Sequence, residues 1–413
     1  MSAVPLYNPF LPEFRRDPYP VYAAIRAKEP VHRFAGFRGE QWLLVRYRDV
    51  RSLLADARFR VDDLPEQMAT KAALAGTNFD RLIACIKHWL FFRDPPDHDV
   101  VRRLFSRDLS PGGVEHHRAL VLNIVDALLD QALLQGSWDL IRDLAHPLPT
   151  LVMAALQGIP AAEMPLVVEW SRRLFGVLVP PQPLDSYRRM DEVVHDFVRF
   201  FAPHVAKARA ESPRNLLGLL TRAEADGQLD EAGVYAFAIM LFSVGQETTE
   251  NLIGNGMLGL LRHPDQADML RNDVGLCADA VDEMLRYDTP VQGVARLSTE
   301  PVMIDDIVIP AGARVNFSLG AANRDPVQFQ DPDRFLIQRT ERSKLPFGAG
   351  IHFCLGAHLA RLQAECVVQR LFERAPDIRL HASEFEWRES VLLRGIKALP
   401  VVTSPIPKRV AAQ

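Results

Sequence analysis

The hydrophobic positions along this chain predict a mainly helical protein with a small β portion. Between residues 100 and 286, apolar residues recur every three or four positions, which is the spacing of amphipathic helices. Further helices are predicted over residues 19–27, 48–56, 237–261, 280–286 and 355–373. Short runs rich in β-forming residues predict strands over residues 41–46, 302–304 and 315–319.

Length and composition narrow the class of protein. The chain has 413 residues, of which 48% are hydrophobic and 24% charged, with a formal net charge of −4. This balance excludes a disordered chain, a collagen-like repeat and a strongly basic nucleic-acid-binding protein. Because no long polar linker divides the sequence, we expect one large domain over residues 1–413, with a frayed tail from about residue 403.

Cysteine usage bears on the compartment. The four cysteines form neither a Cys-x-x-Cys pair nor a zinc-binding pattern with histidine. So few cysteines in a long chain favour a reducing compartment, and we expect a cytoplasmic protein. The first residues lack the basic and apolar regions of a signal peptide, so we expect no membrane anchor. We also expect a monomer that binds no nucleic acid.

The segment FGAGIHFCLG, residues 347–356, is the most informative part of the sequence. Cys354 stands just before a predicted helix, behind a loop that holds Gly348 and Gly350. Glycine lets a flat ligand approach the backbone, and free amides at a helix start favour a thiolate. Gly356 in the first turn leaves room for a planar macrocycle. The alternative is an inert buried thiol, which we accept for the other three cysteines.

A polar block from Gly245 to Asn251 interrupts the apolar helix predicted over residues 237–261. Such a block argues against a membrane span, for which the length alone would be sufficient. Gly245 weakens the helix, and the Thr248 hydroxyl can compete for a backbone carbonyl. We therefore expect a local opening with space for water. A simple kink with a capped threonine is an equally good alternative on these residues alone.

The segment 347–356 resembles the haem-binding signature of the cytochromes P-450, Phe-Gly-x-Gly-x-His-x-Cys-x-Gly, at every fixed position. Further motifs follow in the family's order over nearly the whole chain. The resemblance implies a P-450 fold, with haem b between the long central helix and the cysteine loop and helix. It implies that Cys354 is the axial ligand of the iron. The other residues implied to contact the haem within this segment are Phe347, Gly348, Gly350, His352 and Gly356.

Two neighbouring residues in the central helix resemble the family's acid–alcohol pair. Glu247 and Thr248 match the carboxylate and hydroxyl that are thought to deliver protons for O–O bond cleavage. Val244 departs from the family pattern, which usually has alanine or glycine immediately before the motif's glycine. If the helix crosses the haem as the resemblance implies, Val244 narrows the space above the iron.

The resemblance also identifies groups that bind the two haem propionates. Carboxylates taken into a protein need charge-assisted hydrogen bonds, and four residues match the family's donors. These residues are His98, Arg102, Arg296 and His352. Lys344 stands where many bacterial relatives carry histidine, and we expect that it also reaches a propionate. A solvated basic surface is the alternative for any one of them taken alone.

Glu283 and Arg286 lie three residues apart in a predicted helix and so share one face. In the family, this Glu-x-x-Arg pair is buried and joined by the arginine of a Pro-x-Arg-Phe segment. Arg334 occupies that position in Pro332-Asp-Arg-Phe335. The resemblance therefore implies a structural trio of Glu283, Arg286 and Arg334 that fixes the loop leading to the cysteine.

The activity implied by the resemblance is that of a monooxygenase inserting one atom of dioxygen into a hydrophobic organic substrate, in reactions such as secondary-metabolite tailoring. Electrons would come from a ferredoxin and an NAD(P)H-dependent ferredoxin reductase. Predicted docking residues for an acidic ferredoxin are Arg102, Arg103, Arg107, His358 and Arg361. Predicted pocket residues are Leu90, Val244, Val291, Val294 and Leu393.

Two alternatives keep the haem. One is a peroxygenase driven by hydrogen peroxide, although such relatives typically lack the acid–alcohol pair that Glu247 and Thr248 form here. The other is a haem-thiolate ligand sensor without turnover, although nothing in the sequence looks like an attached output domain.

Overall fold

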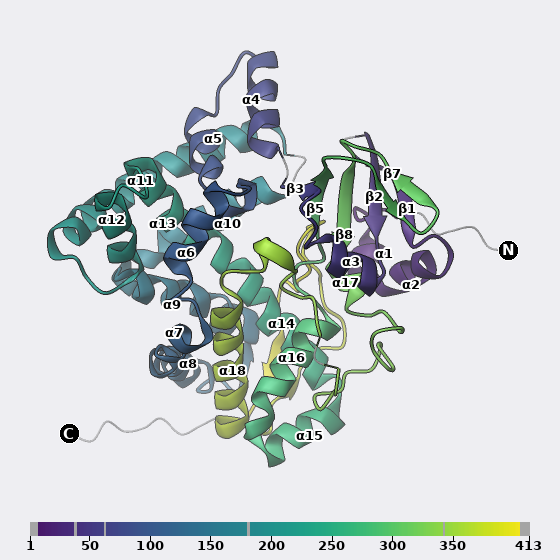
Figure 1. Ribbon diagram of the computed structural model, residues 1–413. Helices are drawn as coiled ribbons and strands as arrows, with labels where there is room; N and C mark the ends of the chain where they lie inside the picture. The colour runs from purple at the N-terminus through teal and green to yellow at the C-terminus, as the bar shows by residue number, and fades with distance from the viewer. Residues whose placement is uncertain (1–6, 37–38, 62, 180–181, 342, 405–413) are drawn as a thin grey trace.

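A computed structural model describes residues 7–36, 39–61, 63–179, 182–341 and 343–404 of the chain. It confirms the predicted mainly helical architecture with a small β portion. Figure 1 shows most helices gathered on one side of the molecule, and the largest sheet with the N-terminal helices on the other.

The largest sheet has the strand order β1-β2-β8-β5-β3. Strands β2 and β8 pair in parallel, whereas the other neighbours are antiparallel. Its strands are β1 (Val31–Gly36), β2 (Gly39–Leu44), β3 (Phe59–Arg60), β5 (Gly293–Ser298) and β8 (Arg314–Ser318). The predicted strands over 41–46 and 315–319 are confirmed with shifted ends. The segment 293–298 was not predicted as a strand, because its apolar and polar residues do not alternate clearly.

Two smaller sheets complete the β portion. The predicted strand over 302–304 is confirmed as β6 (Val302–Ile304), which forms a hairpin with β7 (Ile307–Ile309). A three-stranded sheet joins β4 (Ser137–Asp139), β10 (Pro400–Val402) and β9 (Arg379–Leu380), in that order. It brings the C-terminal part of the chain against the helical side.

The helices follow the apolar periodicity of the sequence and fall into three regions of the chain. The N-terminal helices are α1 (Pro12–Arg16), α2 (Tyr19–Lys28), α3 (Tyr47–Leu53), α4 (Leu64–Leu74), α5 (Asp80–Lys87), α6 (Asp97–Phe105), α7 (Pro111–Glu115) and α8 (Arg118–Ala132). The middle helices are α9 (Pro147–Gln157), α10 (Met164–Phe175), α11 (Leu184–Glu211), α12 (Leu216–Ala225), α13 (Glu231–Gly245) and α14 (Glu247–Leu261). The last helices are α15 (Pro264–Asn272), α16 (Cys277–Tyr287), α17 (Leu319–Ala322) and α18 (Ala357–Arg374).

Short helical turns link these elements. They are η1 (Leu90–Phe92), the π-helical η2 (Ile141–Ala145), η3 (Ala161–Glu163), η4 (Gly176–Leu178), η5 (Val274–Leu276) and η6 (Gly350–His352). The last of these turns lies inside the cysteine loop, directly before the start of α18.

The central helix is divided where the sequence places its polar block. Helix α13 ends at Gly245, Gln246 has φ −83° and ψ −70°, and α14 begins at Glu247. The Thr248 hydroxyl donates to the Val244 carbonyl oxygen at 3.0 Å. The predicted helix is therefore confirmed in place, extended at its start, and broken at the glycine.

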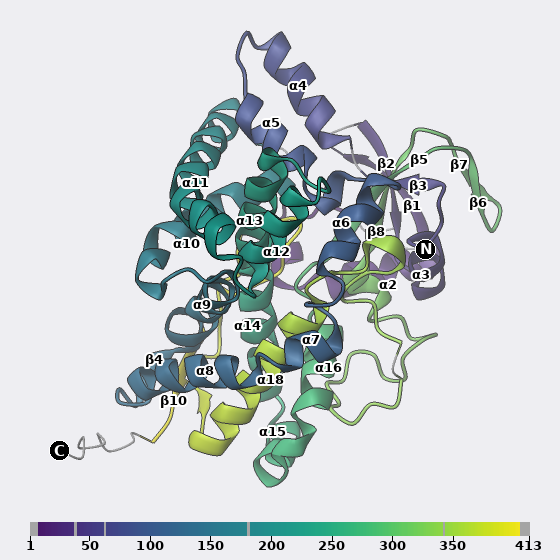
Figure 2. The ribbon, with the colours of Figure 1, turned by 60° about the vertical axis from the view of Figure 1, so that its left-hand side comes forward.

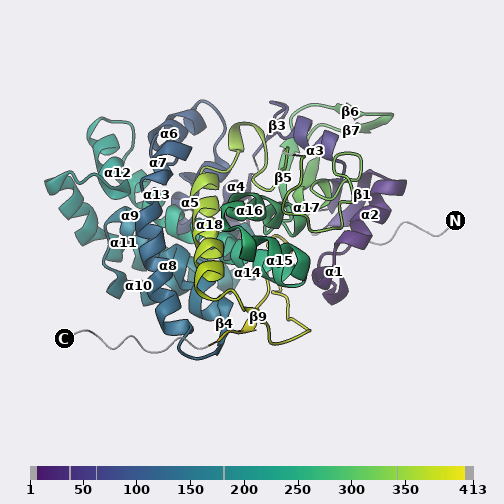
Figure 3. The same ribbon diagram turned by 90° about the horizontal axis from the view of Figure 1, so that it is seen from below.

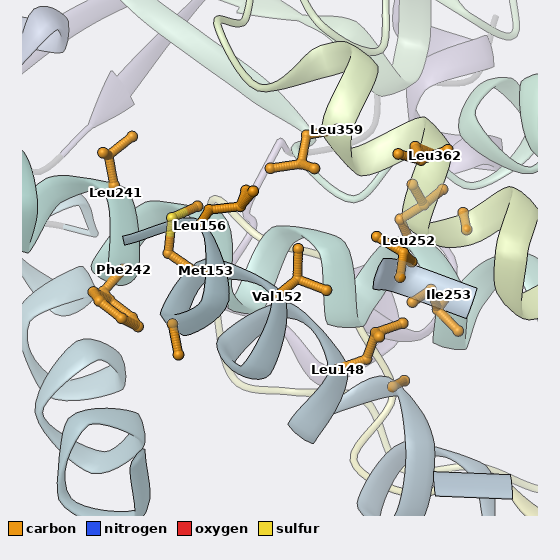
Figure 4. Close-up of a cluster of buried hydrophobic side chains, with 14 of the residues drawn as sticks. Leu148, Val152, Met153, Leu156, Leu241, Phe242, Leu252, Ile253, Leu359 and Leu362 are labelled. Atoms are coloured by element: carbon orange, nitrogen blue, oxygen red, sulfur yellow. The ribbon is translucent and has the colours of Figure 1, made fainter. Parts of the chain in front are cut away.

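Apolar packing fixes this divided helix in the middle of the molecule. Figure 4 shows side chains of α9 (Leu148, Val152, Met153 and Leu156) beside residues of α13, α14 and α18. Helix α18 lies alongside α8 and α16, as Figures 2 and 3 show from two directions. The cysteine at the start of α18 and the break after α13 are thereby held on the same packed core.

Two further observations concern the C-terminal segment and the helix lengths. Buried Thr403 donates its backbone N–H to the Gly136 carbonyl oxygen at 2.8 Å, so the chain is packed as far as this residue. The remainder of the tail that is predicted to fray, 405–413, lies outside the described residues. Among the residues that the model describes, no helix has the length and apolar character needed to cross a membrane.

Candidate active site

A cavity of about 450 Å³ lies where the divided helix, the cysteine loop and strand β5 meet. One part of its wall is the cysteine loop and the start of α18, and another is the polar break between α13 and α14. Its lining includes Val244, Thr248, Val294, Arg296, Phe347 and Cys354. The structure therefore brings together residues that are more than a hundred positions apart in sequence.

The cysteine loop has the backbone geometry that its glycines predict. Gly348 and Gly350 both have φ +73°, a left-handed conformation that disfavours any side chain. A Cβ atom on Gly350 would also lie 2.6 Å from the Leu54 carbonyl oxygen. The Cys354 N–H donates to the Phe347 carbonyl oxygen at 3.0 Å, which closes the loop. These contacts fix the position of the cysteine relative to the cavity.

Cys354 presents its sulfur to the cavity from within the fold, so its exposure is to the cavity. Burial raises the pKa of the Cys354 thiol, while the Gly356 amide, Arg102 and Arg361 act in the opposite direction. The Gly356 amide acts in the direction that the sequence predicts, towards a thiolate, but in the absence of a bound metal burial is the larger effect on the pKa. A metal ion bound to this sulfur would replace the thiol proton, and its positive charge would stabilise the buried thiolate.

Gly356 lines the same cavity at the start of α18. A Cβ atom built on it meets no protein atom within 4 Å, so a side chain there would extend into free space. The glycine keeps this part of the wall flat, as the sequence predicts for a planar ligand.

Four basic side chains line the cavity beside the cysteine loop: His98, Arg102, Arg296 and His352. The two imidazole rings lie 4.6 Å apart, and the Nε2 atom of each is buried with no hydrogen-bond partner among the described residues. The His98 Nδ1 atom is 2.9 Å from Asp99 Oδ1. Buried polar atoms of this kind indicate a missing polar partner.

The charges around the two histidines indicate that the missing partner is negatively charged. Burial, together with the nearby Arg296, His98 and Arg102, lowers the pKa of His352 to about 3. A buried cluster of cationic and neutral donors is favourable only with an anion, such as a carboxylate. The orphaned histidine nitrogens, the two arginines and the flat glycine wall fit the propionates and the ring of haem b.

Lys344 does not belong to this group of donors. Its Nζ atom lies 3.6 Å from Asp282 Oδ2, its side chain is 4% exposed, and it is absent from the cavity wall. The expectation that it reaches a propionate is therefore wrong, because α16 supplies a carboxylate that already pairs with it.

The acid and the alcohol of the central helix occupy different positions. Thr248 lines the cavity, together with its neighbour Thr249. Glu247 does not reach the cavity wall, and burial raises the pKa of its carboxyl, with Arg388 opposing this shift. A raised pKa makes a carboxyl a better proton donor near neutral pH. The two side chains are adjacent in sequence at the first turn of α14.

A buried ion-pair cluster lies behind the cysteine loop. Arg286 donates from Nε and Nη2 to the Glu283 carboxylate, both at 2.7 Å, and neither side chain is exposed. Arg286 also donates to the carbonyl oxygens of Asn323, Pro332 and Arg334 at 3.0, 2.8 and 3.0 Å. The predicted pair is thus present and ties α16 to the segment that leads to the cysteine.

The third arginine of the cluster is Arg339, which corrects the assignment of Arg334. The Arg334 side chain is 67% exposed, and only its carbonyl oxygen reaches the cluster. Arg339 is buried and donates from Nε to Glu283 Oε1 at 3.3 Å. The local Pro-x-Arg-Phe pattern does not specify which arginine turns inward, because the intervening loop sets that direction.

The remainder of the cavity wall is apolar. All five predicted pocket residues line it: Leu90, Val244, Val291, Val294 and Leu393. They come from η1, α13, the segment before β5, β5 itself and the C-terminal segment. Asn316 and Thr249 were not predicted for the same wall. No motif marks these residues, and only the pairing of β8 with β5 places Asn316 there.

Comparison with known proteins agrees with this geometry. The family model described as Cytochrome P450 matches residues 173–374. The chain is 39% identical to the "Cytochrome P450 monooxygenase PikC" of Streptomyces venezuelae, over 94% of this chain and 92% of that protein. It is 32% identical to the "Polyketide biosynthesis cytochrome P450 PksS" of Bacillus subtilis (strain 168), over 97% of this chain and 99% of that protein.

A solved structure has the same fold. "Crystal Structure of CalO2" superimposes with a TM-score of 0.90 at 32% sequence identity, covering 97% of this chain and 99% of that one. The fold and the site define a haem-thiolate oxidoreductase that binds haem b. The chain belongs to the cytochrome P450 family, and it is a monooxygenase of that family.

Proposed function

We propose that this monooxygenase hydroxylates or epoxidises a hydrophobic organic molecule of secondary metabolism, using electrons from a ferredoxin and its NAD(P)H-dependent reductase. One observation carries the proposal: a single cavity joins a cysteine, four propionate-type donors and a large apolar wall. Relatives named for monooxygenation and for polyketide biosynthesis support the chemistry and the pathway class.

The cofactor is held by residues from four parts of the chain. In the proposed assignment, Cys354 would ligate the iron through its sulfur, and Phe347, Gly348, Gly350 and Gly356 would form the wall beside the haem. His98, Arg102, Arg296 and His352 donate to the propionates. A haem with an axial thiolate supplies dioxygen activation when it is bound, because the thiolate favours cleavage of the O–O bond.

Proton supply is the part of the chemistry that the protein itself performs. Thr248 lines the cavity, and its hydroxyl proton is engaged with the Val244 carbonyl oxygen. Its two lone pairs remain free to accept a hydrogen bond from water in the opening of the helix. Glu247 stands next to it with a raised pKa. We assign Glu247 as the proton donor and Thr248 as the hydroxyl that orients the transfer.

The substrate pocket selects for an apolar molecule. The predicted pocket residues are aliphatic, and Phe92, Phe175 and Leu178 extend the apolar wall. Burial of apolar substrate surface against such a wall provides binding energy of about 25 cal/mol per Å². Polyketides, terpenoids and fatty acids all meet this requirement, and the polyketide relatives favour the first class.

Electron transfer is expected to use the face outside the cysteine loop. Arg102 and Arg361 of the predicted docking set are engaged, with the Phe353 oxygen at 2.5 Å and Asp282 at 3.1 Å respectively. Arg103 is exposed on α6, and Arg107 is exposed just after that helix ends. An acidic ferredoxin is the partner that such a surface attracts. We place the reaction in the cytoplasm, where all four cysteines, free in this structure, stay reduced.

The experiment is reconstitution with defined redox partners. The purified holoprotein is combined with a ferredoxin, its reductase and NADPH, and a library of polyketides, terpenoids and fatty acids is screened by spin-state shift. Binders are then incubated with ¹⁸O₂. Incorporation of one labelled oxygen atom into product confirms the proposal. Turnover with hydrogen peroxide but none with the electron-transfer proteins overturns the assigned electron source.

A further inference from the structure

Glu250 forms a buried ion cluster that the acid–alcohol motif does not require. Its side chain is 1% exposed, and three basic side chains from separate elements surround it. His146 Nδ1 is 2.7 Å from Oε2, Arg172 Nη2 is 3.9 Å from the same oxygen, and Arg388 donates from Nη2 to Oε1. His146 caps α9, Arg172 belongs to α10, and Arg388 precedes the pocket segment that contains Leu393.

Glu250 also lies one helical turn from Glu247 on the same helix. Residues three apart in a helix share a face, so the two carboxylates compete for the same cations. No hydrogen bond or ion pair reaches the Glu247 carboxylate among the residues that the model describes, whereas Glu250 has three partners. The cluster therefore pairs directly with Glu250 and acts on Glu247 only at longer range.

The charges around Glu247 explain how the two carboxylates differ. Burial raises the pKa of Glu247, Arg388 lowers it and Glu250 raises it, with smaller lowering effects of Arg172 and His146. Burial also raises the pKa of Glu250, but the bond from His146 and the charge of Arg388 lower it further than burial raises it. The elements α13, α15, α16, α18 and β9, which also pack on α14, supply none of these principal charges.

We propose that Glu250 is a positioning residue for proton supply: it engages Arg388, Arg172 and His146, and thereby leaves the neighbouring Glu247 carboxyl able to hold and release a proton. This inference rests on the proposed role of Glu247 as proton donor. In each cycle Glu247 gives up one proton towards Thr248 and takes one back from water, so its own protonation is restored.

Replacing Glu250 by glutamine separates this role from simple packing. Glu250→Gln keeps the size of the side chain but removes one negative charge. The basic side chains of Arg388, Arg172 and His146 then lose their carboxylate partner. Both changes stabilise the ionised form of Glu247, so its titration shifts to lower pH. Arg388→Gln removes a cation that acts on Glu247, so the titration shifts to higher pH. A purely structural cluster would not give shifts of opposite sign.

The test is an infrared pH titration of the purified holoprotein, in H₂O and in D₂O. The carboxyl C=O band of Glu247 is identified as the band that Glu247→Gln removes. We expect its titration midpoint to fall in Glu250→Gln, to rise in Arg388→Gln, and to stay near the wild-type value in the charge-conserving Glu250→Asp. An unchanged midpoint in Glu250→Gln, or shifts of the same sign in both glutamine variants, overturns the inference.

A second measurement tests the donor role of Glu247 separately from the positioning role of Glu250. In the reconstituted system, coupling is the fraction of NADPH electrons that appears in product instead of hydrogen peroxide. Glu250→Gln is expected to lower coupling and to increase the solvent isotope effect, while Glu250→Asp restores both. If Glu247→Gln itself stays fully coupled, the proposed donor role of Glu247 fails. The infrared shifts still decide whether Glu250 controls the Glu247 carboxyl.

Discussion

Arg339 Nε lies 3.3 Å from Glu283 Oε1, inside a cluster in which neither side chain reaches solvent. The same arginine donates to the carbonyl oxygens of Asp331 and Arg334 at 3.2 and 3.0 Å. Arg339 thereby joins α16 to the loop that precedes the cysteine. The conformation of that loop therefore depends on Arg339, which lies eight residues after Asp331 and binds its carbonyl oxygen.

Arg339→Ala is expected to destabilise the protein by about 1.5–3 kcal/mol. The buried Glu283 carboxylate then loses its charge-assisted hydrogen bond from Arg339, although Arg286 still pairs with it. Arg334→Ala is the matched control, and it should change stability by no more than about 0.5 kcal/mol, since its side chain is exposed. Urea unfolding of the two variants measures the difference. Equal losses in both variants would contradict the assignment of Arg339.

Glu283→Ala is expected to have a larger effect, because it leaves Arg286 as a buried cation without a carboxylate partner and leaves Arg339 with only Glu341. The expected cost is on the order of 3–5 kcal/mol, and haem incorporation should be lost with it. The ratio of Soret to protein absorbance in purified samples measures haem content. A variant that keeps the full ratio would show that the cluster is not needed to form the haem site.

The sequence predicts the local parts of this site well and the long-range parts poorly. Cys354, its glycines and the Glu283–Arg286 pair are defined by spacing within ten residues, and their geometry follows from the sequence. The pairing of Arg339 and of Lys344 depends on how a loop folds over α16, which no periodicity encodes. Two of the three partners of Glu250, His146 and Arg388, lie 104 and 138 residues away along the chain, so only the tertiary fold reveals them.

The helix predicted over residues 237–261 is divided at Gly245, and the hydrophobic pattern alone does not locate that break. Apolar residues resume after the polar block of residues 245–251, so the pattern indicates one helix with a polar interruption. The polar groups that follow the glycine compete with the helical hydrogen bonds, and Thr248 takes the Val244 oxygen. The break was therefore predictable from composition, but the residue at which α13 ends was not predictable from hydrophobicity.

Val244→Ala is expected to change the ratio of products, because the valine side chain belongs to the cavity wall beside Thr248. Removing two methyl groups enlarges that wall and permits another substrate orientation. Val234→Ala, at a buried position of α13 outside the cavity wall, is the matched control for general loosening of the core. Product analysis by mass spectrometry decides between them, and identical product ratios in wild type and Val244→Ala would remove the valine from the substrate site.

Arg103→Glu is expected to slow reduction by an acidic ferredoxin, most strongly at low salt, because it reverses a charge on the exposed side of α6. Arg379→Glu makes the same change at an exposed position of β9 and should leave the rate unchanged. Stopped-flow reduction at two ionic strengths measures the effect. The docking site lies elsewhere if the two variants are reduced at equal rates.

The acid stability of the protein should depend on Glu250. Its pKa lies below the ordinary value of 4.5, because His146 and Arg388 outweigh the effect of burial. The folded state then binds fewer protons than the unfolded state, so the stabilisation is complete above pH 4.5 and is lost as pH falls through the lower folded value. Urea unfolding between pH 7 and pH 3 should show a shallower decline below pH 4.5 in Glu250→Gln. A parallel decline in both proteins would show that Glu250 is not a charged partner in the cluster.

The central claim is that the Cys354 sulfur ligates the haem iron, and the absorption spectrum of the reduced protein with carbon monoxide tests it most directly. Wild type is expected to show the strongly red-shifted Soret band of thiolate ligation. Cys354→Ser, if it takes up haem, should lack this band. A wild-type spectrum typical of a nitrogen ligand, or a red-shifted band that persists in Cys354→Ser, would contradict the assignment.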